Sequence, residues 1–149
     1  MRKIKFRGKR IGDNKWVEGC FCKAKKYTDH LEDNERAYIL QVIDRRENGI
    51  NAIEIEVDPA TVGQYVGLKD SKRTKEYPEG QEIYEGDIVE CVYDGVLNTH
   101  VAIYDISELG FKATNGKENY GGNFEYLPCC EEVIVIGNVH DNPELAKEV

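Results

Sequence analysis

The chain has 149 residues, a mass of 17.0 kDa and a mean hydropathy of −0.58. This length suits one domain, or two very small ones that share a core, and it excludes a long multidomain enzyme. No apolar run approaches the roughly 18 residues needed to span a bilayer, so we predict no membrane insertion and no membrane partner.

The N-terminus predicts a cytoplasmic protein. Residues Met1–Phe6 carry positive charge but are not followed by the apolar stretch of about 7–15 residues that a secretory signal requires. In a reducing compartment the five cysteines are expected to be thiols, and their odd number fits thiols better than a disulfide framework.

Charge is distributed unevenly along the chain. The first 26 residues carry ten basic and two acidic side chains, a net charge of +8, whereas the remaining residues carry ten basic and 26 acidic ones, a net charge of −16. The two parts should attract each other within one molecule or between neighbouring molecules. Nucleic-acid binding by the basic end is the alternative, which a pI near 5.0 opposes.

In the N-terminal region, period-two alternation predicts a strand that starts at Lys3 and exposes its basic side chains. We expect this strand to lie on a sheet edge, where lysines discourage unwanted pairing. The turn Gly12–Asn14 then leads into a second strand, Trp16–Lys23, with Trp16 buried. The candidate nucleic-acid-binding residues are the basic ones of this hairpin: Arg2, Lys3, Lys5, Arg7, Lys9 and Arg10.

The middle of the chain predicts a loop and a second hairpin. Residues Tyr27–Arg36 are polar and acidic, typical of an exposed loop. Ala37–Ile43 and Ile50–Val57 have strand length and are joined by a turn at Asp44–Gly49. The carboxylates of Glu54, Glu56 and Asp58 share one strand face, and we interpret them as a solvated surface in preference to a metal site.

Five short strands are expected after a turn-rich segment that spans Asp70–Gly80. The first runs from Ile83 to a turn at Asp94–Gly95, and five such strands suit a small barrel or a strongly bent sheet. The other four are expected at Val101–Ile106, Phe111–Thr114, Phe124–Leu127 and Val133–Val139. Asn142 and Pro143 then predict the start of a short helix, with Asn142 as its N-cap.

The sequence predicts no reactive centre. The cysteines and histidines lack the C-x₂₋₄-C spacing of structural zinc sites, so we assign the cysteines to buried free thiols and predict no metal and no cofactor. The thiols and imidazole that this spacing argues against as zinc ligands are those of Cys20, Cys22, Cys129, Cys130 and His140. No phosphate-binding glycine loop is present, because Gly63 and Gly67 are followed by neither a lysine nor a hydroxyl at the required position.

Several strings resemble the YopX family, in that family's order and over nearly the whole chain. They are Met1–Arg10 with Trp16–Gly19, then Val57–Pro59 with Thr61–Asp70, then Ile83–Val89, and finally Ile136–Leu145. The resemblance implies a small, mostly β protein of bacteriophage or prophage origin, and it supplies no catalytic residues. Gly86 and Asp87 are interpreted as structural residues of a tight turn that leads into a strand, as in SH3-like barrels: the glycine allows the turn, and the aspartate accepts backbone N–H groups.

We therefore predict a mainly β protein with an N-terminal hairpin lobe at residues 1–68, a connecting segment at 69–81 and a barrel-like, SH3-like lobe with a terminal helix at 82–149. The predicted function is a non-enzymatic binding or assembly module in the bacterial cytoplasm. Self-association is the leading expectation, and a protein partner from phage or host is a further option. Nucleic-acid binding is the alternative, and a metal-dependent hydrolase is the least favoured class.

Overall fold

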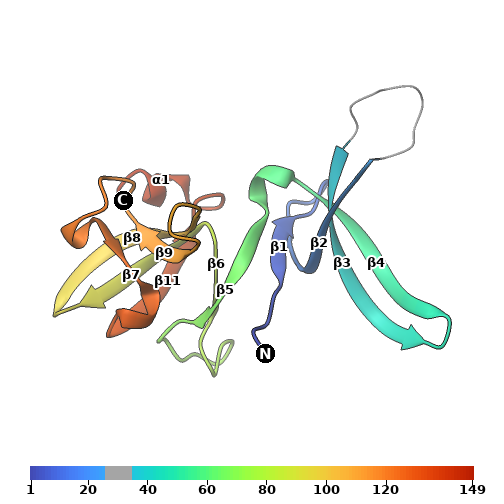
Figure 1. The fold of residues 1–149 in the computed structure, drawn as a ribbon, viewed down its shortest axis with the longest axis horizontal. Coiled ribbons are helices and arrows are strands. Elements are labelled where there is room, and N and C mark those ends of the chain that lie inside the picture. Colours follow the sequence, from blue (N-terminus) through green and yellow to red (C-terminus); the bar gives the residue numbers. More distant parts are fainter. Residues whose placement is uncertain (26–34) are drawn as a thin grey trace. The chain divides into compact units, whose positions relative to one another are not determined.

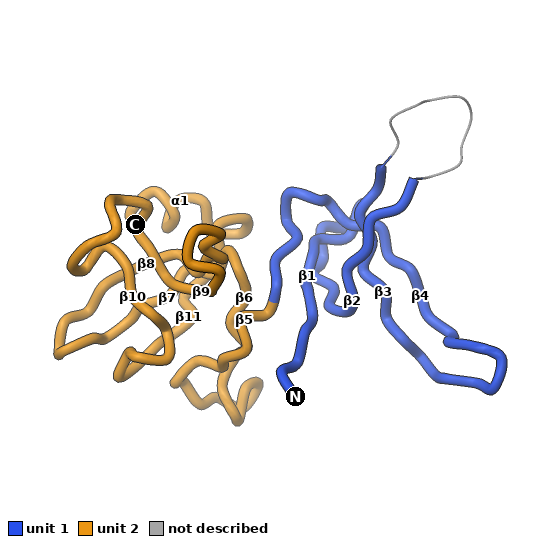
Figure 2. The backbone as a smooth tube through the Cα atoms, viewed as in Figure 1, with its two compact units in different colours: residues 1–64 blue, residues 65–149 orange. Residues whose placement is uncertain are grey.

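The computed structural model describes residues 1–25 and 35–149, which form the predicted mainly β protein with one short C-terminal helix (Figure 1). The chain divides into two compact units, residues 1–64 and 65–149 (Figure 2). Most of the loop predicted at 27–36 lies outside the described residues. Its last two residues, Glu35 and Arg36, belong to a strand, which corrects that part of the prediction.

The first unit is an antiparallel sheet in the order β4-β3-β2-β1, and both predicted hairpins are confirmed. The chain directly after β4 contacts the end of β1, where the Asp58 N–H donates to the Lys9 carbonyl at 2.8 Å. The elements are β1 (Phe6–Lys9), β2 (Trp16–Lys25), β3 (Glu35–Arg46), β4 (Gly49–Val57) and the 3-10 turn η1 (Pro59–Thr61). The second hairpin is longer than predicted, because its strands extend into the expected turn at 44–49 and leave only two residues between them.

A small apolar cluster fills the first unit. Ala37, Ile39 and Val57 are buried, and Phe6 and Phe21 pack against them. Gly19 lets β2 approach β3 closely, because a Cβ there would lie 2.2 Å from the carbonyl oxygen of Leu40.

Two predictions for the N-terminal hairpin are wrong. β1 is not an edge strand, because it pairs with β2 on one side and with the start of β5 (Gly63–Lys69) on the other. Trp16 is only half-buried, because it lies on the sheet face opposite the apolar cluster, under the cationic groups of Arg7 and Lys9.

The division between the units falls inside β5. Its first two residues pair with β1, and from Tyr65 onward it belongs to the second unit, where Tyr65 pairs with Tyr84 of β6 (Glu82–Tyr84). This division lies ahead of the predicted boundary at residue 68. The predicted connecting segment 69–81 is part of the second unit.

The second unit contains the five predicted strands as one antiparallel sheet, in the order β10-β9-β8-β7-β11. They are β7 (Asp87–Tyr93), β8 (Val96–Asp105), β9 (Gly110–Thr114), β10 (Phe124–Glu125) and β11 (Glu132–Asn138). Two 3-10 turns, η2 (Gly121–Asn123) and η3 (Leu127–Cys129), flank β10, and α1 (Pro143–Ala146) ends the chain. No helix in the described part of the chain is long and apolar enough to cross a bilayer.

The predicted role of Gly86 and Asp87 is confirmed by their hydrogen bonds. Gly86 has a φ of +87°, and its N–H donates to the Ala102 carbonyl at 2.8 Å. Asp87 is buried, and its Oδ2 accepts the Tyr84 N–H at 2.7 Å. The predicted N-cap position of Asn142 is confirmed, but its side chain makes no cap bond to α1, because its Oδ1 accepts the Asn138 N–H of β11 at 3.2 Å.

Asp70 connects the segment after β5 to the sheet of the second unit through hydrogen bonds to its carboxylate. Its side chain is 3% exposed, Oδ1 accepts the Gln81 N–H at 2.8 Å, and Oδ2 accepts the Val135 N–H of β11 at 3.2 Å. The neighbouring Ser71 N–H donates to the Val133 carbonyl at 2.7 Å. One buried carboxylate therefore satisfies backbone donors on two segments that are distant in sequence.

Replacing Asp70 with alanine should lower the free energy of unfolding by about 1–3 kcal/mol, because backbone N–H groups would lose their buried acceptor. Urea denaturation followed by circular dichroism measures this change. The control is Lys75→Ala in the same segment, where the side chain is exposed and little change is expected. Equal effects of the two substitutions would contradict the assigned role of Asp70.

Candidate functional site

Polar side chains occupy the core-facing side of the sheet in the second unit. On β7 and β8, Cys91 pairs directly with Asn98 and Val89 pairs with His100. Directly paired residues of antiparallel strands point to the same side, so Asn98 and His100 lie on the same face as the buried Cys91 and Val89. Glu125 of β10 reaches this face through its pairing with the buried Ala113 of β9.

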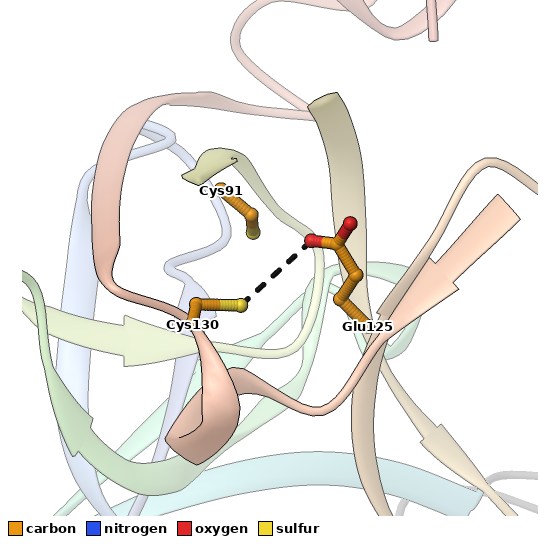
Figure 3. Close-up of side chains that lie close together, drawn as sticks. All are labelled: Cys91, Glu125 and Cys130. Carbon is orange, nitrogen blue, oxygen red and sulfur yellow. Dashed lines mark hydrogen bonds between the residues drawn. The ribbon is translucent and has the colours of Figure 1, made fainter. Parts of the chain in front are cut away.

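Two thiols and a carboxylate converge on this face (Figure 3). Ligand atoms of Cys91, Glu125 and Cys130 all lie within 4.8 Å of one another, and Cys91 and Glu125 are buried. The Cys130 Sγ lies 3.7 Å from Glu125 Oε2, and Asn98 Nδ2 donates to Glu125 Oε1 at 3.0 Å. Three elements supply this thiol–carboxylate cluster: β7, β10 and the residue that follows η3.

Burial keeps both thiols of the cluster protonated at neutral pH. Desolvation raises the pKa of Cys91 far above its ordinary value, and desolvation with the nearby Glu125 carboxylate raises the pKa of Cys130 to about 11. A thiol is a poor nucleophile compared with its thiolate, so these cysteines do not have the properties of catalytic nucleophiles.

His100 is a buried imidazole on the same face. Its side chain is 1% exposed, and neither ring nitrogen completes a hydrogen bond within the described residues. Burial lowers the pKa of His100, and this effect outweighs the Glu125 carboxylate and the nearby backbone of Gly122 and Thr99, which favour the charged ring. The folded protein therefore holds His100 as the neutral imidazole.

A pocket of about 530 Å³ opens beside the cluster. Asn98 and Glu125 form polar parts of its lining, and Cys129, the neighbour of Cys130, contributes to its wall. Tyrosine and phenylalanine side chains supply much of the remaining surface. The aromatic lining residues are Tyr93, Phe124 and Tyr126. The pocket gives the carboxylate of the cluster a route to solvent.

Lys112, which contacts the pocket residue Phe124, is held by two carboxylates. Its side chain is 2% exposed, and its ammonium contacts Asp105 at 2.5 Å and Glu108 at 3.3 Å. The hydrogen bond from Lys112 lowers the pKa of the Asp105 carboxyl, and the carboxylates raise the pKa of Lys112. The ammonium of Lys112 also lies 5.0 Å from the ring centroid of Phe124, so the two carboxylates and the ring together hold its charge in place.

The basic residues proposed for nucleic-acid binding differ in their burial and in their contacts with carboxylates. Arg7 is buried against Trp16, with 4.5 Å between the guanidinium carbon and the ring centroid. The Lys5 ammonium contacts Glu18 at 3.0 Å, and the hydrogen bond from Arg10 lowers the pKa of Asp13 to about 2. Arg2 and Lys3 are exposed, and Lys9 is half-buried. Nucleic-acid binding by this set stays a prediction.

The sulfur and imidazole groups of Cys20, Cys22, Cys129, Cys130 and His140 do not form one cluster in the structure. All five cysteines lie in the described residues, and Cys91 alone is buried, so the assignment of all of them to buried thiols is wrong. Cys130 meets Cys91 and Glu125 instead of the other four candidates, Cys20, Cys22, Cys129 and His140. Local spacing missed this cluster because its members are separated by 34 and five positions in the chain.

The first unit carries a different feature, an arm formed by residues 41–53 of β3 and β4 (Figure 1). Pairing between β2 and β3 ends at Leu40, whereas pairing between β3 and β4 continues to Arg46 and Gly49. Within the described residues the arm is thus a two-stranded ribbon with no third strand beside it. Isolated two-stranded hairpins are only marginally stable in water.

Large apolar side chains are exposed on both faces of the arm. Val42 and Ile53 lie on opposite faces, because Val42 pairs with Ala52 whereas Ile53 pairs with Gln41. The exposed fractions are 57% for Val42, 57% for Ile43, 65% for Ile50 and 49% for Ile53. Such a group of exposed apolar residues is typical of an interaction surface.

Comparisons with known proteins place the chain in a family. The family model described as YopX protein matches residues 5–147, so the chain belongs to the YopX family. The fold is similar to that of protein EF1440 from Enterococcus faecalis, whose crystal structure is 20% identical in sequence, with a TM-score of 0.52. That alignment covers 98% of this chain and 99% of the other. No curated protein matches the sequence.

His100 should make stability depend on pH in mildly acidic solution. The unfolded chain takes up a proton near the ordinary histidine pKa of about 6.5, whereas the folded protein resists protonation until lower pH. The free energy of unfolding should therefore fall as pH drops from about 7 toward 5. Urea denaturation across this range should show a shallower slope for His100→Leu than for the wild type. An unchanged slope in the variant would contradict the neutral, buried state.

Proposed function

We propose that the protein is a non-enzymatic assembly module that self-associates through the apolar arm of residues 41–53. The observation that carries this proposal is the exposure of Val42, Ile43, Ile50 and Ile53 on a ribbon that no third strand supports in the described residues. Covering a half-exposed aliphatic side chain contributes on the order of 1 kcal/mol, and the four side chains recur on each copy. A partner would also fix the ribbon, which lacks support of its own.

The charge of the arm is compatible with a second copy of this chain as the partner. The chain as a whole carries −8, which opposes the approach of two identical molecules. Residues 41–53 contain Asp44, Arg45, Arg46 and Glu47, so the arm has no net charge. Two arms can therefore meet at a location free of the net repulsion between the whole chains, and a twofold axis would bring the same patch from each copy together.

A non-enzymatic role is supported by the state of the groups in the second unit. The Cys91 and Cys130 thiols are held protonated, which weakens them as nucleophiles. The Lys112 ammonium is held by carboxylates. The buried neutral His100 completes no hydrogen bond to a nucleophile among the described residues.

The proposed setting is the cytoplasm of a bacterial host, with the protein as a product of a bacteriophage or prophage. This part of the proposal is supported by YopX family membership. A protein partner from phage or host remains compatible with the arm, because an exposed apolar ribbon can accept another surface of suitable shape. Nucleic-acid binding is less favoured, because Arg7 is buried and Lys5 and Arg10 are paired with carboxylates.

Light scattering coupled to size-exclusion chromatography tests the assembly at low and high salt. The wild type should exceed the monomer mass under both conditions, because association of apolar side chains survives or strengthens when salt screens charges. Association only at low salt would instead indicate contacts between the basic N-terminal part and the acidic remainder, and would contradict the assigned surface.

A double substitution within the arm should release the monomer. Val42→Glu and Ile50→Glu place charges on one face of the ribbon, where burial between two copies would be costly. The matched control is Ile106→Glu, which alters an 81% exposed isoleucine in the turn between β8 and β9. A wild type that is monomeric at both salt concentrations would overturn the proposed assembly.

A further inference from the structure

We propose that Cys91, Glu125 and Cys130 form a binding site for a borderline-soft divalent cation, with Zn²⁺ as the best-fitting ion. The proposal concerns the second unit alone, and it is independent of the arm in the first unit. Its basis is the convergence of two sulfurs and a carboxylate on the core face of one sheet (Figure 3).

The donor set has the chemistry of a zinc site. Thiolate ligands select soft and borderline ions over Mg²⁺ and Ca²⁺, and zinc accepts sulfur and carboxylate oxygen together. In a tetrahedral site with Zn–S of about 2.3 Å and Zn–O of about 2.0 Å, a sulfur and an oxygen lie roughly 3.5 Å apart. The 3.7 Å between Cys130 Sγ and Glu125 Oε2 is close to that separation.

The spread of the three ligand atoms also suits one shared ion. Because they all lie within 4.8 Å of one another, small side-chain rotations bring them to tetrahedral separations. The second shell is partly in place, because Asn98 Nδ2 donates to Glu125 Oε1 at 3.0 Å and leaves Oε2 facing the sulfurs. Binding converts both thiols to thiolates, and the two protons leave to solvent.

The pocket gives a cation access to the site. Glu125 and Asn98 belong to its lining, so an ion can reach the carboxylate first and then the two sulfurs behind it. Three protein ligands leave a fourth position, which water or a ligand in the pocket can occupy. The ion would link β7, β10 and the chain after η3, where β10 has only two residues of strand pairing to hold it.

The cost of the cluster supports a role beyond packing. The buried His100 on the same face completes no hydrogen bond within the described residues, and a carboxylate and two thiols lie beside it, so this interior is less stable than an apolar interior of the same shape. The Cys130–Glu125 and Asn98–Glu125 hydrogen bonds would satisfy the cluster if its role were purely structural. Titration with cations separates the two cases, because only a metal site responds to added cations.

The test is titration of the reduced, metal-free full chain with Co²⁺, followed by absorption spectroscopy. Thiolate coordination produces sulfur-to-cobalt charge-transfer bands, and tetrahedral geometry produces intense d–d bands. We expect both to saturate at one Co²⁺ per chain and to disappear when Zn²⁺ is added. Zn²⁺ at about 100 times its Kd should also raise the thermal midpoint by several degrees.

Matched variants locate the ligands. Cys130→Ser should abolish the charge-transfer bands and the thermal shift, whereas Cys129→Ser, its exposed neighbour, should retain both. Glu125→Gln should weaken Co²⁺ binding about tenfold or more while it keeps the sulfur bands. Far-UV circular dichroism confirms that each variant is folded, and Cys91→Ser supplies a second test of the sulfur ligands.

Three results would overturn the site. One is the absence of sulfur-to-cobalt bands in the reduced wild type with excess Co²⁺. Another is the survival of those bands in both folded variants, Cys130→Ser and Cys91→Ser. The third is their loss in a Cys20→Ser or Cys22→Ser variant, which would move the sulfur ligands to the first unit.

Discussion

The mismatch in length between neighbouring strand pairings is the constraint on which the proposed assembly depends. β3 pairs with β2 only as far as Leu40, yet it continues with β4 to the turn at Glu47–Asn48. Beyond Leu40, β3 is hydrogen-bonded on one edge only, to β4. The side chains of this part of β3 do not belong to the apolar cluster around Ile39. The apolar side chains of the arm are exposed for this reason.

The second unit shows the opposite arrangement, because there the sheet encloses polar groups. Cys91, His100 and Glu125 point to the side that Val89, Ala102 and Ala113 fill. Burial then keeps the thiols protonated and the imidazole neutral. A pocket lined in part by Asn98 and Glu125 reaches the edge of this polar interior, and this distinguishes it from a core that is closed on all sides.

Sequence patterns predicted the strands, the turns and the short helix, because alternation and turn residues act over a few neighbours. They failed where side chains from distant strands meet. The edge position expected for β1 depended on which strand lies beside it, and Gly63 and Gln64 of β5 are distant in sequence. Trp16 was expected to be buried, but its sheet face is covered by Arg7 and Lys9. The convergence of Cys91 with Cys130 likewise needed three-dimensional register.

Hydrogen–deuterium exchange at two protein concentrations tests the central claim, that the arm joins copies of the chain, most directly. Amides of residues 41–53 should exchange slowly in concentrated solution and become faster on dilution below the dissociation constant, because an unsupported ribbon opens readily. Amides of β7 and β8 should serve as the internal reference and exchange at the same rate in both samples. Fast exchange of the arm at both concentrations would contradict the account.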